Sequence, residues 1–502
     1  MNQFSAATAI GLILAASPAL AELTPKSVWD QMSEYYARGD LTVETASIEE
    51  AGDTLSVRGL VLTQTSPTGG LRLDMGDVVL NATGDGNVRV DMPDTMTGKI
   101  TLKDVDQSDP SDATIDMTIS APGETLIVRE DGAGRVYEYV FPMIEVVLDR
   151  LETSDGDVLE RPAVITLTDM RGSDRTEGTA PMQLAQAGTI AGAELAVNID
   201  QPELKVGGTM TAGAMAFSFD SLIPEQGNLG EQIAEAIKAG LTMQGGGTIA
   251  SFDMNISFSG VDDYGTESGG TITSNSRDMK VGLAMSADGI TYGGSSGAGT
   301  VEAMIPDLPV AVSYGVESTE FSLTFPLVAS PDDQDAKLLY ALNGLTLSDS
   351  VWSLFDPSGA LPRDPASVMI DVAAKARLDV DILDPTALEN ATEAPGDISS
   401  VSIRKVALSL MGASADVNGE ISVPAGGSIE EPVGTINGRF EGVNTLLDKL
   451  VAAGLVPQDQ VMGIRMMLMM FAKADPANPD LLTTELEFRE GGQIFANGQQ
   501  VK

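Results

Sequence analysis

The sequence predicts a β-rich α+β protein: a long, twisted, mostly antiparallel sheet with one apolar face that a few helices cover. The first observation is an apolar–polar alternation that recurs from Leu55 to Phe488, as in LRLDM and TIDMTIS. A period of two puts successive side chains on opposite faces of a strand, so such a strand buries one face only. The second observation is the spacing of turn clusters such as SPTGG, which separate the alternations at hairpin distances and indicate antiparallel pairing.

The N-terminus has the layout of a secretory signal peptide. An apolar run over residues 6–16 leads into Ser17-Pro18 and then into an A-x-A site formed by Ala19 and Ala21, with Glu22 directly after it. The run is too short to span about 30 Å of hydrocarbon, and no later run is long and apolar enough for a transmembrane helix. We therefore expect cleavage after Ala21 and a soluble, exported, periplasmic protein, with an uncleaved anchor as the alternative.

The N-terminal half, residues 22–243, is expected to carry two helices among its strands, near 25–38 and 229–240. Thr24-Pro25 is typical of an N-cap followed by Pro at the first helical position. Asn228 with Glu231 resembles a capping box at the start of the second helix.

The C-terminal half, residues 244–502, begins at the glycine-rich stretch 244–247, and the glycine-rich stretch 265–270 is the other candidate for the boundary. Helical spacing of apolar residues predicts four helices in it, near 331–343, 348–355, 443–453 and 458–473. The boundary between the halves is an inference from glycine content, and a single sheet running through both is the alternative.

Composition excludes most catalytic and metal chemistries. The 502-residue chain has no His and no Cys, which rules out Ser-His-Asp and Cys-His nucleophile systems and ordinary zinc sites. Its 73 Asp and Glu against 29 Lys and Arg give a formal net charge of −44, and such a surface repels nucleic-acid phosphates. The acidic surface suits solubility, with diffuse collection of Ca²⁺ or Mg²⁺ as the functional alternative. We expect no cofactor, no nucleic-acid partner and no catalytic residue.

Three short fragments resemble known catalytic or ligand-binding motifs, but each lacks the structural context or the further residues that its motif requires. SIRK, from Ser402 to Lys405, matches S-x-x-K, but that motif needs the start of a helix and this stretch has the pattern of a strand. The glycine-rich GGSSGAG lacks the spacing of a dinucleotide-binding loop, and Asp104 with Asp106 begins like a calcium loop without its later ligands. We interpret all three as structural.

Five methionines lie within nine residues in VMGIRMMLMMFAKADP, from Val461 to Pro476. At about 100° per residue, one arc of this helix is the expected buried face. It consists of Ile464, Met467, Leu468, Met470 and Phe471. Met462, Met466 and Met469 form a second stripe beside Arg465, which we take as a candidate apolar contact. Three thioethers could hold Cu(I), but copper-handling segments usually add His or Cys, so we expect core packing or contact with an apolar ligand and no metal site.

The C-terminal segment from Gly438 to Val501 contains a helical hairpin, GRFEGVNTLLDKLVAAGLVPQDQVMGIRMMLMMFAKADP, and then a final β-hairpin that ends at Asn497-Gly498. It resembles the C-terminus of domain-of-unknown-function family 2125, which comprises uncharacterised exported proteins of Gram-negative bacteria. The blocks LSLMGASADVNGEISV and GTINGRFEGVNTLLDKL are also similar, in a generic way, to the strand–Gly–strand units of AsmA-like envelope proteins. The resemblance implies an envelope location and carries no site residues.

Together these observations predict a non-enzymatic exported cell-envelope protein, with a lipid or an envelope protein as its partner. It would use an apolar sheet face, closed by the methionine-rich helix, to carry or contact lipid. One alternative is a carboxylate-dependent hydrolase of the envelope, which would need two carboxyl groups about 5–10 Å apart. The other is a purely structural or protein-interaction module.

Overall fold

The computed structural model describes thirteen stretches of the chain, and every structural statement below concerns them. They are residues 23–38, 41–66, 68–103, 112–132, 134–178, 181–225, 233–261, 265–306, 308, 310–384, 388, 394–424 and 431–502. The chain divides into two compact units, unit 1 ending at Thr271 and unit 2 running from Ile272 to Lys502. The expected boundary at 243/244 therefore differs from that of the structure by one long strand. The predicted cleavage residues Ala19, Ala21 and Glu22 lie outside the described residues.

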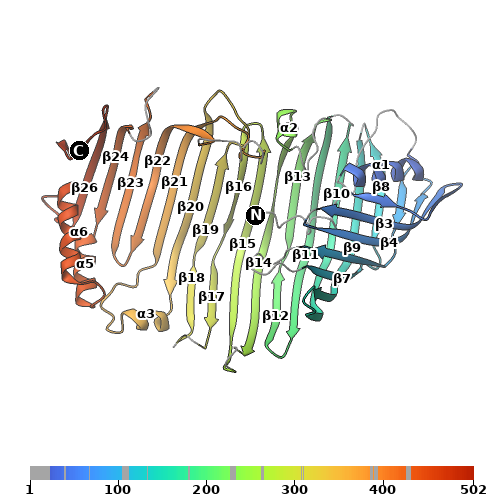
Figure 1. The fold of residues 1–502 in the computed structure, drawn as a ribbon, viewed down its shortest axis with the longest axis horizontal. Helices are drawn as coiled ribbons and strands as arrows, with labels where there is room; N and C mark the ends of the chain where they lie inside the picture. The colour runs from blue at the N-terminus through green and yellow to red at the C-terminus, as the bar shows by residue number, and fades with distance from the viewer. Residues whose placement is uncertain are drawn as a thin grey trace. The chain divides into compact units, whose positions relative to one another are not determined.

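The predicted fold class is confirmed, because strands in antiparallel pairs dominate both units and the described helices are few and short (Figure 1). Unit 1 contains α1 (Pro25–Arg38), β1 (Thr42–Glu44), β2 (Ser47–Ala51), β3 (Thr54–Ser66), β4 (Gly69–Ala82), β5 (Val88–Asp91), β6 (Thr95–Leu102), β7 (Ala113–Ser120), β8 (Thr125–Asp131), β9 (Gly134–Thr153), β10 (Val158–Glu177), β11 (Met182–Asp200), β12 (Leu204–Ala212), β13 (Met215–Ile223), α2 (Ile233–Lys238) and β14 (Thr242–Val261). β15 (Glu267–Ser286) crosses the boundary between the units. Of the expected helix near 229–240, the structure describes α2, and its capping box lies outside the described residues.

Unit 2 continues with shorter strands and three of the described helices. Its elements are β16 (Gly289–Ser296), β17 (Gly299–Met304), β18 (Val312–Val316), β19 (Ser318–Phe325), β20 (Gln334–Leu347), α3 (Asp349–Phe355), β21 (Ala366–Leu378), β22 (Gly396–Leu410), β23 (Ala413–Ser422), β24 (Val433–Glu441), α5 (Val443–Ala452), α6 (Gln458–Phe471), β25 (Lys473–Ala474), β26 (Leu481–Arg489), β27 (Gln493–Ala496) and β28 (Gln499–Gln500). The helix expected near 331–343 is wrong, because most of that stretch belongs to β20.

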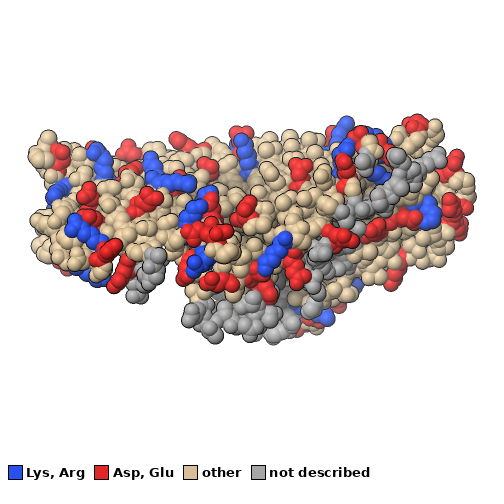
Figure 2. Space-filling view, turned by 90° about the horizontal axis from the view of Figure 1, so that it is seen from above, with Lys and Arg blue, Asp and Glu red and all other residues tan. Residues whose placement is uncertain are grey.

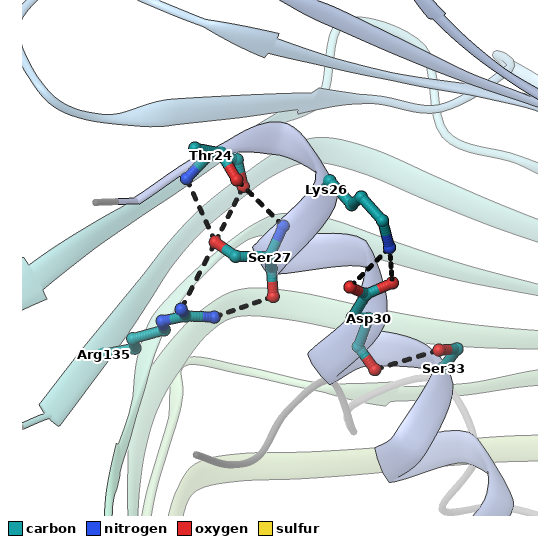
Figure 3. Close-up of polar contacts among 6 residues, drawn as sticks. All are labelled: Thr24, Lys26, Ser27, Asp30, Ser33 and Arg135. Atoms are coloured by element: carbon teal, nitrogen blue, oxygen red, sulfur yellow. Dashed lines mark hydrogen bonds and ion pairs between the residues drawn. The ribbon is translucent and has the colours of Figure 1, made fainter. Parts of the chain in front are cut away.

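The start of α1 follows the capping rule that its sequence predicts. The backbone N–H of Ser27 donates to Thr24 Oγ1 at 3.1 Å, and Ser27 Oγ accepts from the backbone N–H of Thr24 at 3.0 Å (Figure 3). This reciprocal pair satisfies two amides that a helix N-terminus leaves without partners. Arg135 of β9 reaches the same turn and donates to the Ser27 carbonyl at 2.9 Å, while Lys26 pairs with Asp30 on the exposed side at 2.7 Å.

Helix α1 closes the core of unit 1. Its apolar stripe, Val28, Trp29, Met32 and Tyr36, is buried against strands β3 to β9. The same cluster contains Leu55 and Leu80 from β3 and β4, Val88 from β5, Leu126 from β8 and Tyr137 from β9. Helix and sheet thus form the two layers that a core requires.

The rest of unit 1 is a run of long strands. β9, β10 and β11 have 19 or 20 residues each and pair in that order. β12 and β13 lie end to end between β11 and β14, since each pairs with both of those strands.

In unit 2 the pairs give the strand order β15, β16, β19, β20, β21, β22, β23, β24, β26, β27. Helices α5 and α6 lie side by side at the C-terminal end of this unit, next to β26 (Figure 1). Gly442, the N-cap of α5, has no side chain to cap the helix, and Asp480 supplies the acceptor by taking hydrogen bonds from the Asn444 amide and the Thr445 hydroxyl at 3.0 and 2.6 Å.

Candidate functional site

The candidate site is one face of the sheet in unit 2, which we call the apolar face. Residues paired directly across antiparallel strands point to the same side of a sheet, so the register defines rows of neighbouring side chains. The first row consists of Tyr292, Leu323, Leu338, Val372, Ile403, Gly419, Ile436, Leu486 and Ala496. The second row consists of Gly294, Phe321, Tyr340, Ile370, Val406, Val417, Gly438 and Thr484. The third row consists of Thr319, Leu342, Val368, Leu408, Ala415, Phe440 and Leu482. Apart from two threonines, every member is apolar or glycine.

The apolar face is only partly covered. Tyr292, Leu338, Tyr340 and Leu408 are 36 to 50 % exposed. Within the three rows only Gly438, Leu482 and Ala496 are buried, and the remaining members are half-buried or exposed. Most of the fully buried apolar side chains among the described residues instead belong to unit 1. Unit 2 therefore presents a broad apolar surface where a globular domain would have the interior of a core.

The opposite face of the same sheet carries the charges. Asp335 lies between Lys337 at 2.7 Å and Lys375 at 2.8 Å, and hydrogen bonds from these two ammonium groups lower the pKa of Asp335 to about 2. Further pairs on this face are Lys405–Asp416, Arg439–Glu441 and Arg489–Glu487. The two faces thus differ sharply in polarity. The charged groups of these pairs form ion pairs with one another on the face opposite the apolar rows.

Acidic groups also dominate the surface more widely. Figure 2 shows Asp and Glu side chains across the view from above, with Lys and Arg interspersed among them. Among the described residues, no cluster of three or more acidic side chains is close enough to hold a metal ion. Ser402 and Lys405 lie within β22, so the S-x-x-K match falls in a strand as expected.

Helix α6 differs from its predicted orientation. The expected inner arc is wrong for Ile464, Met467 and Met470, which are exposed, while Leu468 and Phe471 are half-buried. The candidate contact stripe Met462, Met466 and Met469 is exposed as well. The packed side is instead formed by Val461, Arg465 and Leu468.

The physical reason for this rotation is Arg465. Its guanidinium pairs with Asp448 of α5 at 2.7 Å and donates to the Asn444 carbonyl at 3.1 Å. At the C-terminus of α6, the side-chain amide of Asn497 donates to the Phe471 carbonyl at 3.0 Å, which ties the final Asn-Gly turn to the helix.

Sequence reasoning missed the part of the apolar face that lies on β20. Leu338, Tyr340 and Leu342 repeat with period two, but Leu338, Leu339 and Leu342 also fit a helical stripe. A stretch this short satisfies both templates, and only its neighbours in the sheet decide between them.

No described helix is both long and apolar enough to cross a membrane. Residues 246–496 match the model of a protein family described as "Uncharacterized protein conserved in bacteria (DUF2125)". The matched segment includes most of β14, the three rows of the apolar face and α6. No curated protein and no solved structure matches the chain.

Proposed function

Because the chain belongs to the DUF2125 family of uncharacterized proteins conserved in bacteria, we propose its function from the site: it is a non-enzymatic, exported cell-envelope protein that holds lipid acyl chains on the apolar face of unit 2. The observation that carries the proposal is the unbroken register of apolar side chains from Tyr292 on β16 to Ala496 on β27. The layout of residues 1–22 as a signal peptide supports export.

The dimensions of the face suit an acyl chain. The first row crosses nine strands and, at about 4.8 Å spacing, is about 38 Å long. One leaflet contributes about half of a hydrocarbon core of ~30 Å, so a row can accommodate two acyl chains end to end. Side chains such as Leu338 and Leu408, which are 37 and 45 % exposed, provide the apolar contacts.

The energetics point the same way. Each square ångström of apolar surface removed from water contributes roughly 25 cal/mol, and a ligand that covers the half-exposed rows supplies the second layer that a one-sided sheet requires. The ion-paired carboxylates on the opposite face, such as Asp335, are engaged by cations. This favours a carrier over the carboxylate-dependent hydrolase, whose acid and base need to be free to exchange protons.

The proposal is tested first on the native protein. The mature chain is purified from its bacterial source without detergent, and an organic extract is analysed by mass spectrometry for lipids in stoichiometric amount. Binding of a fluorescent fatty acid to the delipidated protein then gives the affinity. A protein that yields no lipid and binds no fatty acid would contradict the proposal, and turnover of an added phospholipid ester would favour the hydrolase.

Neighbouring residues of β20 and β21 provide a matched pair of variants. Leu338→Gln with Tyr340→Gln places two amides on the apolar face, whereas Leu339→Gln with Met369→Gln places two on the opposite face. We expect the first variant to weaken fatty-acid binding roughly tenfold or more, since it removes apolar contact worth more than ~1.4 kcal/mol. The second variant should bind as the wild type does. Equal binding by both variants would show that the apolar face is not the site.

A further inference from the structure

Helix α6 exposes more apolar surface than any packing role requires. Met462, Ile464, Met466, Met467, Met469 and Met470 are 40 to 76 % exposed. At about 100° per residue, these six side chains cover an arc of about 220° around the helix axis. We call this the methionine arc. The packed side, Val461, Arg465 and Leu468, occupies the remainder.

The methionine arc carries no net charge in a strongly acidic chain. Between Val461 and Phe471 the single charged residue is Arg465, and Asp448 neutralises it from the packed side. With a formal net charge of −44, the chain elsewhere presents a surface that repels anions. The arc is thus a tract suited to an uncharged apolar partner.

The size of the arc decides between two kinds of partner. The side chains of the arc belong to the nine residues from Met462 to Met470, which extend about 14 Å along the helix axis, so an arc of 220° at ~5 Å radius covers about 260 Å². A stable protein interface needs about 800 Å² from each partner, and a second copy of the chain would touch only one side of so wide an arc. Lipid molecules can contact the whole exposed arc of a helix. Interfacial helices bury their apolar face about 5–10 Å into the boundary of headgroups and acyl chains.

We propose that α6 lies in the interface of a lipid bilayer with its methionine arc inserted, so that unit 2 docks on a membrane surface. The helix is too short to cross the bilayer, which needs about 20 apolar residues. Methionine suits this position because its unbranched, polarizable side chain adapts to a fluid surface. The inference goes beyond the proposed carrier function and rests on α6 alone, so cargo binding by the apolar face is a separate property.

The test is flotation of the purified mature chain with vesicles of phosphatidylcholine and phosphatidylethanolamine. The wild type should float with these neutral vesicles to the same extent at low and high salt, and less with vesicles rich in phosphatidylglycerol, because the acidic surface is repelled. The triple variant Met462→Gln, Met466→Gln, Met469→Gln keeps good helix formers but removes three apolar contacts. We expect its vesicle partition coefficient to fall roughly tenfold or more.

Substitution of the same three residues by Leu is the matched control, and it should leave flotation intact. Circular dichroism should be unchanged in both triples because the replaced side chains are exposed. Wild-type protein that stays at the bottom of the gradient would overturn the proposal, as would a glutamine triple that floats like the wild type. A wild-type dimer that the glutamine triple converts to monomers would overturn it in favour of a second copy. Fatty-acid binding, measured on the same proteins, should be unaffected by either triple, which separates this proposal from the carrier function.

Discussion

Arg465 of α6 and Asp448 of α5 form an ion pair of 2.7 Å, and this contact fixes which side of α6 is packed. The Arg465 guanidinium also donates to the Asn444 carbonyl at 3.1 Å. Asp448 is largely exposed, whereas Arg465 is half-buried, so the two partners contribute unequally.

Arg465→Gln should loosen α6 more than Asp448→Asn does. The arginine change removes both the ion pair and the hydrogen bond to the carbonyl, and should cost about 1–2 kcal/mol. The aspartate change removes only an exposed ion pair and should cost less than ~1 kcal/mol. Hydrogen exchange of the α6 amides measures both effects. Equal protection in the two variants would show that the carbonyl contact does not hold the helix.

Asp174 in β10 should make unit 1 less stable as the pH rises. The side chain is 2 % exposed, its Oδ1 has no hydrogen-bond partner among the described residues, and burial raises its pKa from 3.8 to about 7. Between those two values the unfolded chain releases a proton that the folded chain retains, so the free energy of unfolding falls as pH rises from about 4 to 7 and is level above that.

Asp174→Asn removes this titration, and we expect a gain on the order of 1–3 kcal/mol at pH 8 with little gain at pH 4. Urea unfolding at the two pH values provides the comparison. Asp155→Asn, an exposed aspartate in a turn of the same unit, is the control and should change neither value. A pH-independent effect of Asp174→Asn would argue against burial as the cause of the raised pKa.

Gln31, on the buried side of α1, should be an essential acceptor for β9. Its Oε1 accepts from the buried Tyr137 hydroxyl at 2.9 Å and from the Arg135 guanidinium. Gln31→Leu leaves both donors without that acceptor and should cost about 2–3 kcal/mol, whereas Tyr137→Phe should cost about 1 kcal/mol. A double-mutant cycle by urea unfolding tests the coupling. Additive losses would mean that the two side chains act independently.

Two glycines of β11 should respond differently to alanine. A Cβ at Gly188 would lie 2.5 Å from the Phe217 ring across the strand pair, whereas one at Gly192 would find its nearest neighbour at 3.5 Å. Gly188→Ala should destabilise unit 1 by about 1–3 kcal/mol because the ring has to move. Gly192→Ala should be neutral or stabilise by up to ~1 kcal/mol through the unfolded chain. Melting temperatures in the reverse order would refute the role of the ring.

The sequence predicts the strands well because each carries its own local signal. The alternation in TIDMTIS is confirmed as β7, and the predicted capping of α1 by Thr24 is confirmed by its hydrogen bonds with Ser27. The helix prediction for β20 is wrong because Leu338, Leu339 and Leu342 also fit helical spacing. Pairing of Leu338 with Leu323 and Val372 decides for the strand, and this pairing depends on residues distant in sequence.

The sequence predicts that the site is an apolar sheet face, but it does not predict which residues form that face. One-sided alternation predicts an apolar face, but which residues become neighbours depends on strand order and on the bulge between Ile403 and Val406. The orientation of α6 depends on the contacts of Arg465 with Asp448 and Asn444 of α5, which no local pattern reveals.

The half-exposed apolar face ties the stability of unit 2 to its surroundings. A molecule that binds the folded sheet and not the unfolded chain adds RT ln(1 + [L]/Kd) to the free energy of unfolding, about 2.7 kcal/mol when its free concentration is a hundred times Kd. Loaded and stripped protein would then melt at different temperatures although their sequences are identical. A denaturation curve would then report how much of the protein is loaded, and stripped protein would expose its half-buried strands to proteases before loaded protein does.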